Sequence, residues 1–536
     1  MKKNLIPNWP LYASLVVFLS VMWLTIIVSV SQNQGHLIYA ADDPYIGMAV
    51  ARNFARFGVW GVTRFGFTSS SSTILWTLLL SLSYYLGGTG ELAPLWWNLL
   101  IAVLVLGVSY AILSKYKVSA TATFAALLGI IILLPLPTLV LLGMEHTLQT
   151  LLSLLAVFLA GQLISGESVD SERRIMLWLL VLAPLVTATR FEGMFLVAAI
   201  AGLCLLVRRW RFALGFGVGG FLPVMIHGII SVSHGWFWFP ASVLLKASLP
   251  NSRSGASLFL SVINPVFVNF RDAIHTLALL IAVLLVYILA SGKGSIATES
   301  RQVMGAILVF LWVAHVEFVG ASPLYRYDAH LCAVSIIFGA AQLPVIASPF
   351  PLLFSLSTWR NPRNLACGAL TLLLFFPVAV KGGRLLWYLP QCTTNIFEQQ
   401  YQMGLFVRRY YQGSTVALND IGAVNYLAEI HCLDLMGLAN PEVARAKRRG
   451  KFDVPAMQNL AKQNGTRIAI IYDDWFNEGL PPEWTRIGRW TIQHNVIAAK
   501  STVSFYAVGP HESTHLKESL TDFFSRLPGD VIQQGH

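Results

Sequence analysis

Long apolar runs recur along the first 380 residues of this chain. A helix needs roughly 20 apolar residues to cross a bilayer, and many of the runs approach or reach that length. They lie near residues 11–30, 93–113, 119–136, 145–163, 175–189, 192–207, 212–231, 273–290, 303–320, 326–343 and 365–380. Only 12% of the residues are charged, whereas an average soluble domain is about 25% charged. The sequence therefore predicts a polytopic α-helical membrane protein with about 11 transmembrane helices.

The distribution of Lys and Arg predicts which ends of the spans face the cytoplasm. Basic residues collect in short cytoplasmic loops, and with the N-terminus inside, all of the basic clusters fall on that side. The clusters are Lys2-Lys3, Lys115/Lys117, Arg173-Arg174, Arg208-Arg209/Arg211, Lys293 and Arg360/Arg363. This assignment requires that the segment 73–88, which is short and interrupted by Ser and paired Gly, does not cross fully. We interpret it as a re-entrant or interfacial segment.

The character of the chain changes near residue 384, where charge density rises and long apolar runs stop. Short strand-like strings alternate there with helical patterns, which predicts an α/β domain. The strand-like strings are 415–418, 467–472 and 503–508, and the helical patterns are 440–449 and 455–463. We therefore expect a transmembrane domain over 1–383, with its first extracytoplasmic loop at 31–92, and an extracytoplasmic α/β domain over 384–536.

The same topology brings the unusual polar residues of the spans to the outer side. Ionisable groups at membrane depth are costly and tend to mark functional sites. These residues are Asp42, Asp43, Glu145, His146, Arg190, Glu192, Lys246, His315, Glu317, Tyr325 and Arg326. We expect an active site near the outer leaflet.

Asp42 and Asp43 are adjacent acids just after the first span, in a chain with only 26 Asp and Glu residues. Pro44 suits the first turn of a helix, so Asp43 is the natural N-cap, whereas Asp42 has no such duty. Apolar residues at helical spacing over 46–57 predict an amphipathic helix in the membrane interface. A carboxylate there can take a proton from an acceptor hydroxyl or hold a cation against a phosphate. We predict both acids as catalytic residues, with Asp42 as the base and capping as the alternative role of Asp43.

Several short motifs follow the acid pair in a fixed order. They read Asp42-Asp43-Pro44-Tyr45-Ile46, Ala51-Arg52-Asn53 and, over 73–80, Thr-Ile-Leu-Trp-Thr-Leu-Leu-Leu, with further motifs at 143–145, 189–193, 419–423 and 433–438. Together they resemble the GT-C superfamily of integral membrane glycosyltransferases, and more narrowly a bacterial branch that includes mycobacterial arabinofuranosyltransferase-like proteins. A Glu-Gly-Tyr-Thr-Ser string common in that branch is replaced here by 66–70, Gly-Phe-Thr-Ser-Ser, without the Glu. The identity of the sugar donor therefore cannot be transferred from that branch to this chain.

The resemblance implies a glycosyltransferase that uses a polyprenyl-phosphate-linked sugar. The expected partners are that donor, a glycan, lipid or protein acceptor of the cell envelope, and the lipid bilayer. Nucleic acid is not expected, because cytoplasmic loops and phosphate contacts account for the net charge of +11. The expected location is the bacterial inner (plasma) membrane. The cofactor is unknown, and a divalent cation held by Asp42 with Glu145 or Glu192 is left open.

Lys246 and Arg326 are the candidates for holding the donor phosphate. Lys246 ends an aromatic-rich segment, 236–246, and can either neutralise a phosphate leaving group or contact lipid headgroups. Arg326 begins a span on the outer side, and a guanidinium binds phosphate bidentately.

Four further substrate-binding candidates each have a structural alternative. Arg190 and Glu192 occupy a short break between two apolar runs, where they either bind substrate or pair with each other. Glu145 opens a helix, where an acid is stabilised by the helix dipole in any case. Arg52 either binds phosphate or extends to the headgroups.

A transporter or flippase for lipid-linked or anionic envelope substrates is the alternative function. It would use the same outer basic residues without needing a base. Transporters usually carry repeated halves and mid-membrane ionisable groups, and the sequence shows no internal repeat. A non-catalytic envelope scaffold is a third interpretation, which requires that Asp42 tolerate replacement by Asn.

Overall fold

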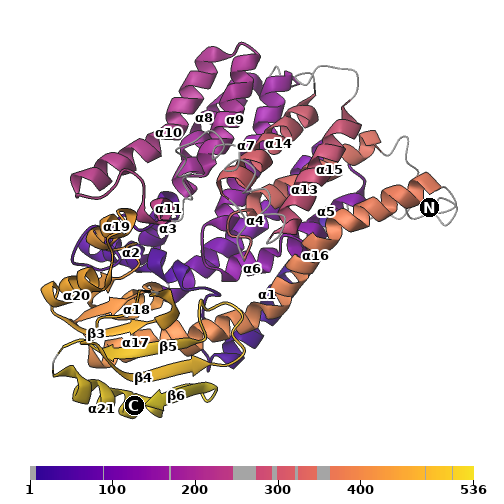
Figure 1. Ribbon diagram of the computed structural model, residues 1–536. Helices are drawn as coiled ribbons and strands as arrows, with labels where there is room; N and C mark the ends of the chain where they lie inside the picture. Colours follow the sequence, from indigo (N-terminus) through magenta and orange to yellow (C-terminus); the bar gives the residue numbers. More distant parts are fainter. Residues whose placement is uncertain are drawn as a thin grey trace.

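The computed structural model describes residues 8–87, 90–167, 171–245, 273–291, 299–319, 324–346, 362–476, 478–509 and 511–535, and for 362–372 only the backbone. A bundle of helices packs against a smaller domain that contains a β-sheet, and the long helix α16 runs from one to the other (Figure 1). The element bounds in the bundle are α1 Trp9–Gln32, α2 Asp43–Phe57, α3 Ile74–Tyr85, η1 Gly90–Leu92, α4 Ala93–Lys115, α5 Ala120–Ile132, α6 Leu136–Leu141, α7 His146–Ser165, α8 Glu172–Thr189, α9 Gly193–Leu206, α10 Trp210–Ser233, α11 Ala241–Leu244, α13 Ile274–Ala290, α14 Ser300–Phe318, α15 Ala329–Ile346 and α16 Pro362–Ile396.

Every apolar run identified in the sequence coincides with one of these helices. Among the described residues, six helices are long and apolar enough to cross a membrane: Trp9–Gln32, Gly90–Lys115, Ala120–Leu141, His146–Ser165, Trp210–Ser233 and Ser300–Phe318. Four shorter apolar helices, α3, α9, α13 and α15, add to them. The chain is a multi-pass helical membrane protein, as predicted, and the number of spans stays a prediction.

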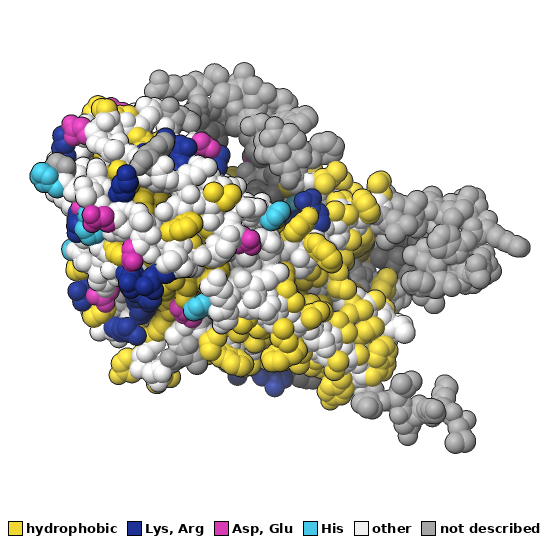
Figure 2. Space-filling view, turned by 90° about the horizontal axis from the view of Figure 1, so that it is seen from below, with side chains coloured by type: hydrophobic (Ala, Val, Ile, Leu, Met, Phe, Trp, Pro, Cys, Tyr) yellow, Lys and Arg dark blue, Asp and Glu magenta, His cyan; other side chains and the backbone are white. Residues whose placement is uncertain are grey.

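The bundle has an interior helix and lipid-facing helices. In its most apolar 18-residue window α7 is 83% buried, whereas α10 is 33% buried and α1 is 28% buried. Large apolar side chains such as Trp23 and Ile229 are exposed on these two outer helices. Figure 2 shows apolar side chains gathered over the bundle, while charged ones gather over the smaller domain. A contiguous apolar surface of this kind is what lipid covers.

Helix α3 is too short to cross a bilayer. It has 12 residues, which at about 1.5 Å per residue gives roughly 18 Å against a hydrocarbon core of about 30 Å. It packs against α2, the amphipathic helix that follows the acid pair. This length agrees with the expectation that 73–88 is not a full crossing.

The smaller domain is a three-layer α/β structure. In the described residues its sheet has six strands in the order β2-β1-β3-β5-β4-β6, with β2, β1 and β3 parallel and the others antiparallel. The bounds are β1 Thr415–Leu418, β2 His431–Asp434, β3 Thr466–Ile471, β4 Thr485–Ile492, β5 Thr502–Ala507, β6 Val531–Gly535, and for the helices α17 Gln402–Tyr410, α18 Gly422–Leu427, α19 Pro441–Arg448, α20 Val454–Gln463, η6 Asp473–Trp475 and α21 Glu512–Phe524. Because side chains alternate along a strand, Val416 packs with α17 and α21 on one face while Ala417 packs with α19 and α20 on the other. The predicted α/β domain is confirmed.

The connection between the two parts is a continuous helical path. Helix α16 leads into a π-helical turn, η5 (Phe397–Tyr401), and then into α17. The proposed boundary at 383/384 lies inside α16, and the sheet begins only at Thr415. Glu398, Gln399 and Gln400 of the turn are buried, and the Tyr472 hydroxyl donates to Gln399 Oε1 at 2.7 Å. Buried polar contacts therefore attach the sheet to the end of α16.

Candidate functional site

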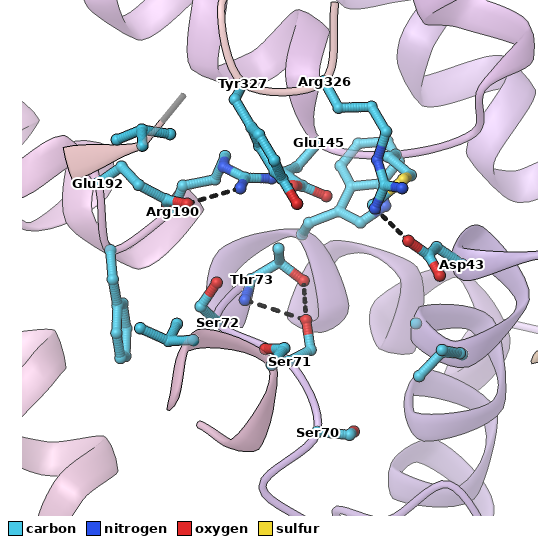
Figure 3. A pocket seen from close by; sticks show the side chains of 18 of the residues that line it. Asp43, Ser70, Ser71, Ser72, Thr73, Glu145, Arg190, Glu192, Arg326 and Tyr327 are labelled. Carbon is cyan, nitrogen blue, oxygen red and sulfur yellow. Dashed lines mark hydrogen bonds and ion pairs between the residues drawn. The ribbon is translucent and has the colours of Figure 1, made fainter. Parts of the chain in front are cut away.

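A cavity of about 290 Å³ lies at the end of the bundle that meets the α/β domain. Its wall draws on segments far apart in the sequence, shown in Figure 3. The lining residues include Asp43 and Gly47 of α2, Ser70 to Thr73 before α3, Glu145, Arg190, Glu192, Phe239, Ser242, Val243, Arg326, Tyr327, and Leu438 from the α/β domain. We call it the main cavity.

Asp43 is the first residue of α2, and its side chain reaches the main cavity. Its carboxylate forms an ion pair with the Arg326 guanidinium, from the turn before α15. The two side chains are 31% and 20% exposed, so both are accessible to a ligand. Helix α2 begins at Asp43 itself with Pro44 in its first turn, so Asp42 and not Asp43 occupies the N-cap position. The predicted N-cap is therefore one residue off.

Asp42 is buried and turned away from the main cavity. Its two carboxylate oxygens accept hydrogen bonds from the backbone N–H groups of Gly422, at 2.6 Å, and Ala423, at 2.7 Å. These are the first residues of α18, so Asp42 fastens the start of α2 to the α/β domain. The sequence did not predict this structural contact of Asp42. Burial, with the nearby Asp420 carboxyl as the next cause, raises the pKa of Asp42 well above its usual range.

Arg190 lies between two acids on the opposite wall. Its guanidinium is 2.5 Å from Glu145 Oε1 and 2.8 Å from Glu192 Oε1. It also lies over the Tyr327 ring, 5.1 Å from the ring centroid. The break between α8 and α9 positions Arg190 and Glu192, and Glu145 precedes α7. The pairing anticipated as an alternative is present, and the structure also brings all three charged groups into the cavity.

A row of hydroxyl groups forms another part of the wall. Ser70, Ser71, Ser72 and Thr73 line the cavity, and Ser71 Oγ lies 2.8 Å from Thr73 Oγ1. Hydroxyls both donate and accept hydrogen bonds, which suits a sugar or a phosphate. This group was not among the predicted site residues. A signal was present, since four consecutive Ser in an apolar chain precede a helix.

Arg52, like Asp42, is a predicted site residue that lies apart from the main cavity. Its guanidinium donates to the carbonyl oxygens of Tyr426 and Asn425. It therefore ties α2 to α18, as Asp42 does. Lys246 lies outside the described residues, and its proposed phosphate contact stays a prediction.

A second cavity of about 20 Å³ lies behind Arg190 and Glu192. His315, which is buried, and His330, which is partly buried, line it. Within the described part of the chain, His315 Nε2, His330 Nδ1 and Glu192 Oε2 are buried without a hydrogen-bond partner. The volume suits one water molecule.

Asp42, Glu145 and Glu192, the acids considered as ligands of a divalent cation, are not arranged to bind one. Both Asp42 oxygens accept backbone N–H bonds, and Glu145 and Glu192 face the Arg190 guanidinium. Over the described ranges no group of three or more His, Cys, Asp or Glu is arranged to hold a metal ion. We derive no chemical step through a cation.

Comparison of the structure with solved protein structures identifies its fold. Residues 394–506 match a family model described as "Domain of unknown function (DUF8728)", and no curated protein sequence matches the chain. The structure is similar to that of ArnT from Cupriavidus metallidurans bound to undecaprenyl phosphate, with a TM-score of 0.53 and 16% sequence identity over 93% of this chain and 98% of that chain. The chain has the GT-C fold.

Other GT-C structures are also similar. The apo state of the same ArnT gives a TM-score of 0.51 with 17% identity over 92% of this chain and 97% of that chain. The apo oligosaccharyltransferase of Archaeoglobus fulgidus gives 0.46 with 11% identity over 92% of this chain and 75% of that chain. At these identities the two ArnT structures establish the fold alone. They confirm the expected GT-C-like membrane protein with a C-terminal α/β domain.

Proposed function

We propose that this chain is a membrane glycosyltransferase that moves a sugar from a polyprenyl-phosphate donor to a hydroxyl of a cell-envelope glycan, lipid or protein. The observation that carries the proposal is the main cavity, which holds a partly exposed carboxylate, Asp43, beside two guanidinium groups, Arg326 and Arg190. The GT-C fold supports it, since a solved structure of that fold contains undecaprenyl phosphate.

Each charged group has a task in such a transfer. Asp43 accepts the proton of the acceptor hydroxyl as its oxygen bonds to the anomeric carbon. The bond between that carbon and the phosphate oxygen breaks, and the lipid phosphate leaves with the bonding electrons. Arg326 and Arg190 stabilise the negative charge on the phosphate by charge-assisted hydrogen bonds. The hydroxyl row from Ser70 to Thr73 can orient the sugar.

Asp42 acts differently in this proposal from its predicted role as the base. Its oxygens are occupied by the N–H groups of Gly422 and Ala423, so it positions Asp43 rather than reacting. The positive-inside pattern supports a location of the cavity and the α/β domain outside the plasma membrane. An acceptor in the envelope would reach the cavity from that side.

The test is sugar transfer by purified protein in liposomes supplied with a pool of polyprenyl-phosphate sugars. We expect Asp43→Asn to lower turnover by about 10²- to 10⁴-fold, as loss of a general base does. Asp474→Asn is the matched control, because that side chain is 69% exposed and pairs with Lys500 in the α/β domain. Equal turnover in Asp43→Asn and wild type would overturn the base assignment. Movement of labelled lipid across the liposome without transfer would support the transporter instead.

A further inference from the structure

A dense group of cations lies on the α/β domain in and just after α19. Residues 445–451 read Arg-Ala-Lys-Arg-Arg-Gly-Lys, without an acid among them. Arg448, Arg449 and Lys451 are exposed, and among the described residues none of these three forms an ion pair closer than 4.0 Å. We call this stretch the basic segment.

Two contacts hold the basic segment against the loop that follows α10. The Arg445 guanidinium donates to the Gly235 carbonyl oxygen, and the Arg448 guanidinium lies 5.0 Å from the Phe237 ring centroid. Gly235 comes two residues after the last residue of α10. Figure 1 shows α19 beside this end of α10. The basic segment is therefore fixed at the end of a membrane-spanning helix.

The exposed face of α10 shows where the bilayer lies. Large apolar side chains recur on this face at helical spacing: Leu214, Val218, Phe221, Met225, Ile229 and Val232. Trp238 follows, 39% exposed, and packs on α10 so closely that a Cβ on Gly228 would meet its ring at 2.5 Å. Exposed Trp residues gather at the level of lipid headgroups. The basic segment thus lies at headgroup level, directly after the apolar face ends.

We propose that the basic segment is a docking surface for anionic phospholipid headgroups in the leaflet on this side of the membrane. Lipid phosphate binds guanidinium groups well, and each Lys or Arg near an anionic bilayer surface raises binding about fivefold. The surface adjoins the main cavity, because Phe239 and Val243 after α10 and Leu438 before α19 all line that cavity. Anionic lipid held here would keep the α/β domain seated beside the cavity opening.

The test counts retained lipid and does not depend on transfer activity, so it stays separate from the proposed function. Full-length protein is taken from bilayers of equal parts phosphatidylcholine and phosphatidylglycerol, and bound lipids are counted by native mass spectrometry. The test variant is Arg448→Gln with Arg449→Gln. The matched control is Lys517→Gln with Arg526→Gln, which removes two exposed cations in and just after α21, away from the bundle in Figure 1.

We expect the wild type and the control to retain phosphatidylglycerol preferentially, and the test variant to lose that preference by roughly 25-fold, from about fivefold per cation. Arg448→Lys with Arg449→Lys keeps the charge and should keep the preference. Unchanged retention in the test variant would overturn the proposal, as would an equal loss in the control. A higher KM for acceptor in the test variant with lipid retention unchanged would also overturn it, in favour of an anionic acceptor.

Discussion

The Arg326 guanidinium pairs with the Asp43 carboxylate on the wall of the main cavity. The two residues are 283 positions apart in the sequence, so the pair joins the turn before α15 to the first turn of α2. A donor phosphate offers Arg326 a bidentate partner of higher charge. A phosphate that takes Arg326 would remove this cation from the Asp43 carboxylate. In the proposed mechanism, donor binding and the basicity of Asp43 are therefore coupled through this ion pair.

Replacing Arg326 should weaken donor binding. Charge-assisted hydrogen bonds contribute about 1.5–3 kcal/mol, so Arg326→Gln should raise the donor KM by roughly 10- to 150-fold. Arg326→Lys should recover only part of the loss, because an ammonium cannot bind bidentately. Steady-state transfer at varied donor concentration measures both. Arg64→Gln is the control, since Arg64 pairs with Glu429 in an exposed position. A donor KM unchanged in Arg326→Gln would remove Arg326 from the phosphate site.

Removing the Asp42 carboxylate should destabilise the joint between the bundle and the α/β domain. Asp42→Ala leaves the N–H groups of Gly422 and Ala423 without their acceptor, and each buried unsatisfied donor costs about 1–3 kcal/mol. Asp453→Ala is a matched control, because Asp453 accepts from Ala456 N–H at an exposed helix start, where a lost cap costs about 1 kcal/mol. Thermal unfolding of the detergent-solubilised proteins compares them. Equal losses of stability would mean that the buried joint contributes nothing beyond an ordinary cap.

The sequence predicted the elements that local pattern determines. Apolar runs of about 15 to 20 residues favour helices, and each run named from the sequence falls in helical segments of the described chain. Strands β1, β3 and β5 were anticipated because they are continuous apolar strings. Strands β2, β4 and β6 were not, since β4 carries Arg486 and Arg489 and β6 ends in polar residues. In β4 the buried Ile487, Trp490 and Ile492 alternate with polar residues, so no continuous apolar string marks the strand.

The sequence grouped several of the residues that line the main cavity. Arg190, Glu192, Glu145 and Arg326 converge on one cavity, and the positive-inside pattern had grouped them at the same end of the bundle. Asp43 lines the cavity, whereas Asp42, which we predicted as the base, does not. The partners of Asp42 lie 380 residues away, and a local pattern contains no information on such a contact.

Adding a methyl group at Gly422 should disturb the same joint from the other side. A Cβ on Gly422 would lie 2.1 Å from the Asp42 carbonyl oxygen and 2.5 Å from its Oδ2. Backbone must therefore shift, and Gly422→Ala should lower both the unfolding temperature and turnover. Gly529→Ala is the control, because no atom lies within 4 Å of a Cβ built there. Thermal unfolding and sugar-transfer assays on the two variants measure both effects. A Gly422→Ala protein with normal stability and turnover would show that Asp42 does not position Asp43.

Glu398 should make the stability of the α/β domain depend on pH. Burial, with Asp530 as a second cause, raises its pKa to about 7, against about 4.3 for an unperturbed Glu. The folded state therefore favours the protonated acid. The contribution of Glu398 to the free energy of unfolding is fully present below about pH 4.3. It falls as the pH rises to about 7 and is absent above that. Glu398→Gln keeps the shape without the charge, so it should stabilise the protein by roughly 3 kcal/mol at pH 8 and by very little at pH 4.

Thermal unfolding of wild type and Glu398→Gln at about pH 4, 6 and 8 measures this difference in stability. Burial also raises the pKa of Asp42 and Asp420, but those two acids are present in both proteins, so the difference between the curves isolates Glu398. Glu518→Gln, at an exposed position on α21, serves as the control. The expected result is a gap between Glu398→Gln and wild type that widens with pH, while Glu518→Gln follows wild type throughout. A gap of constant size would mean that Glu398 has the same pKa in the folded and unfolded states, and that burial in the turn η5 does not raise it.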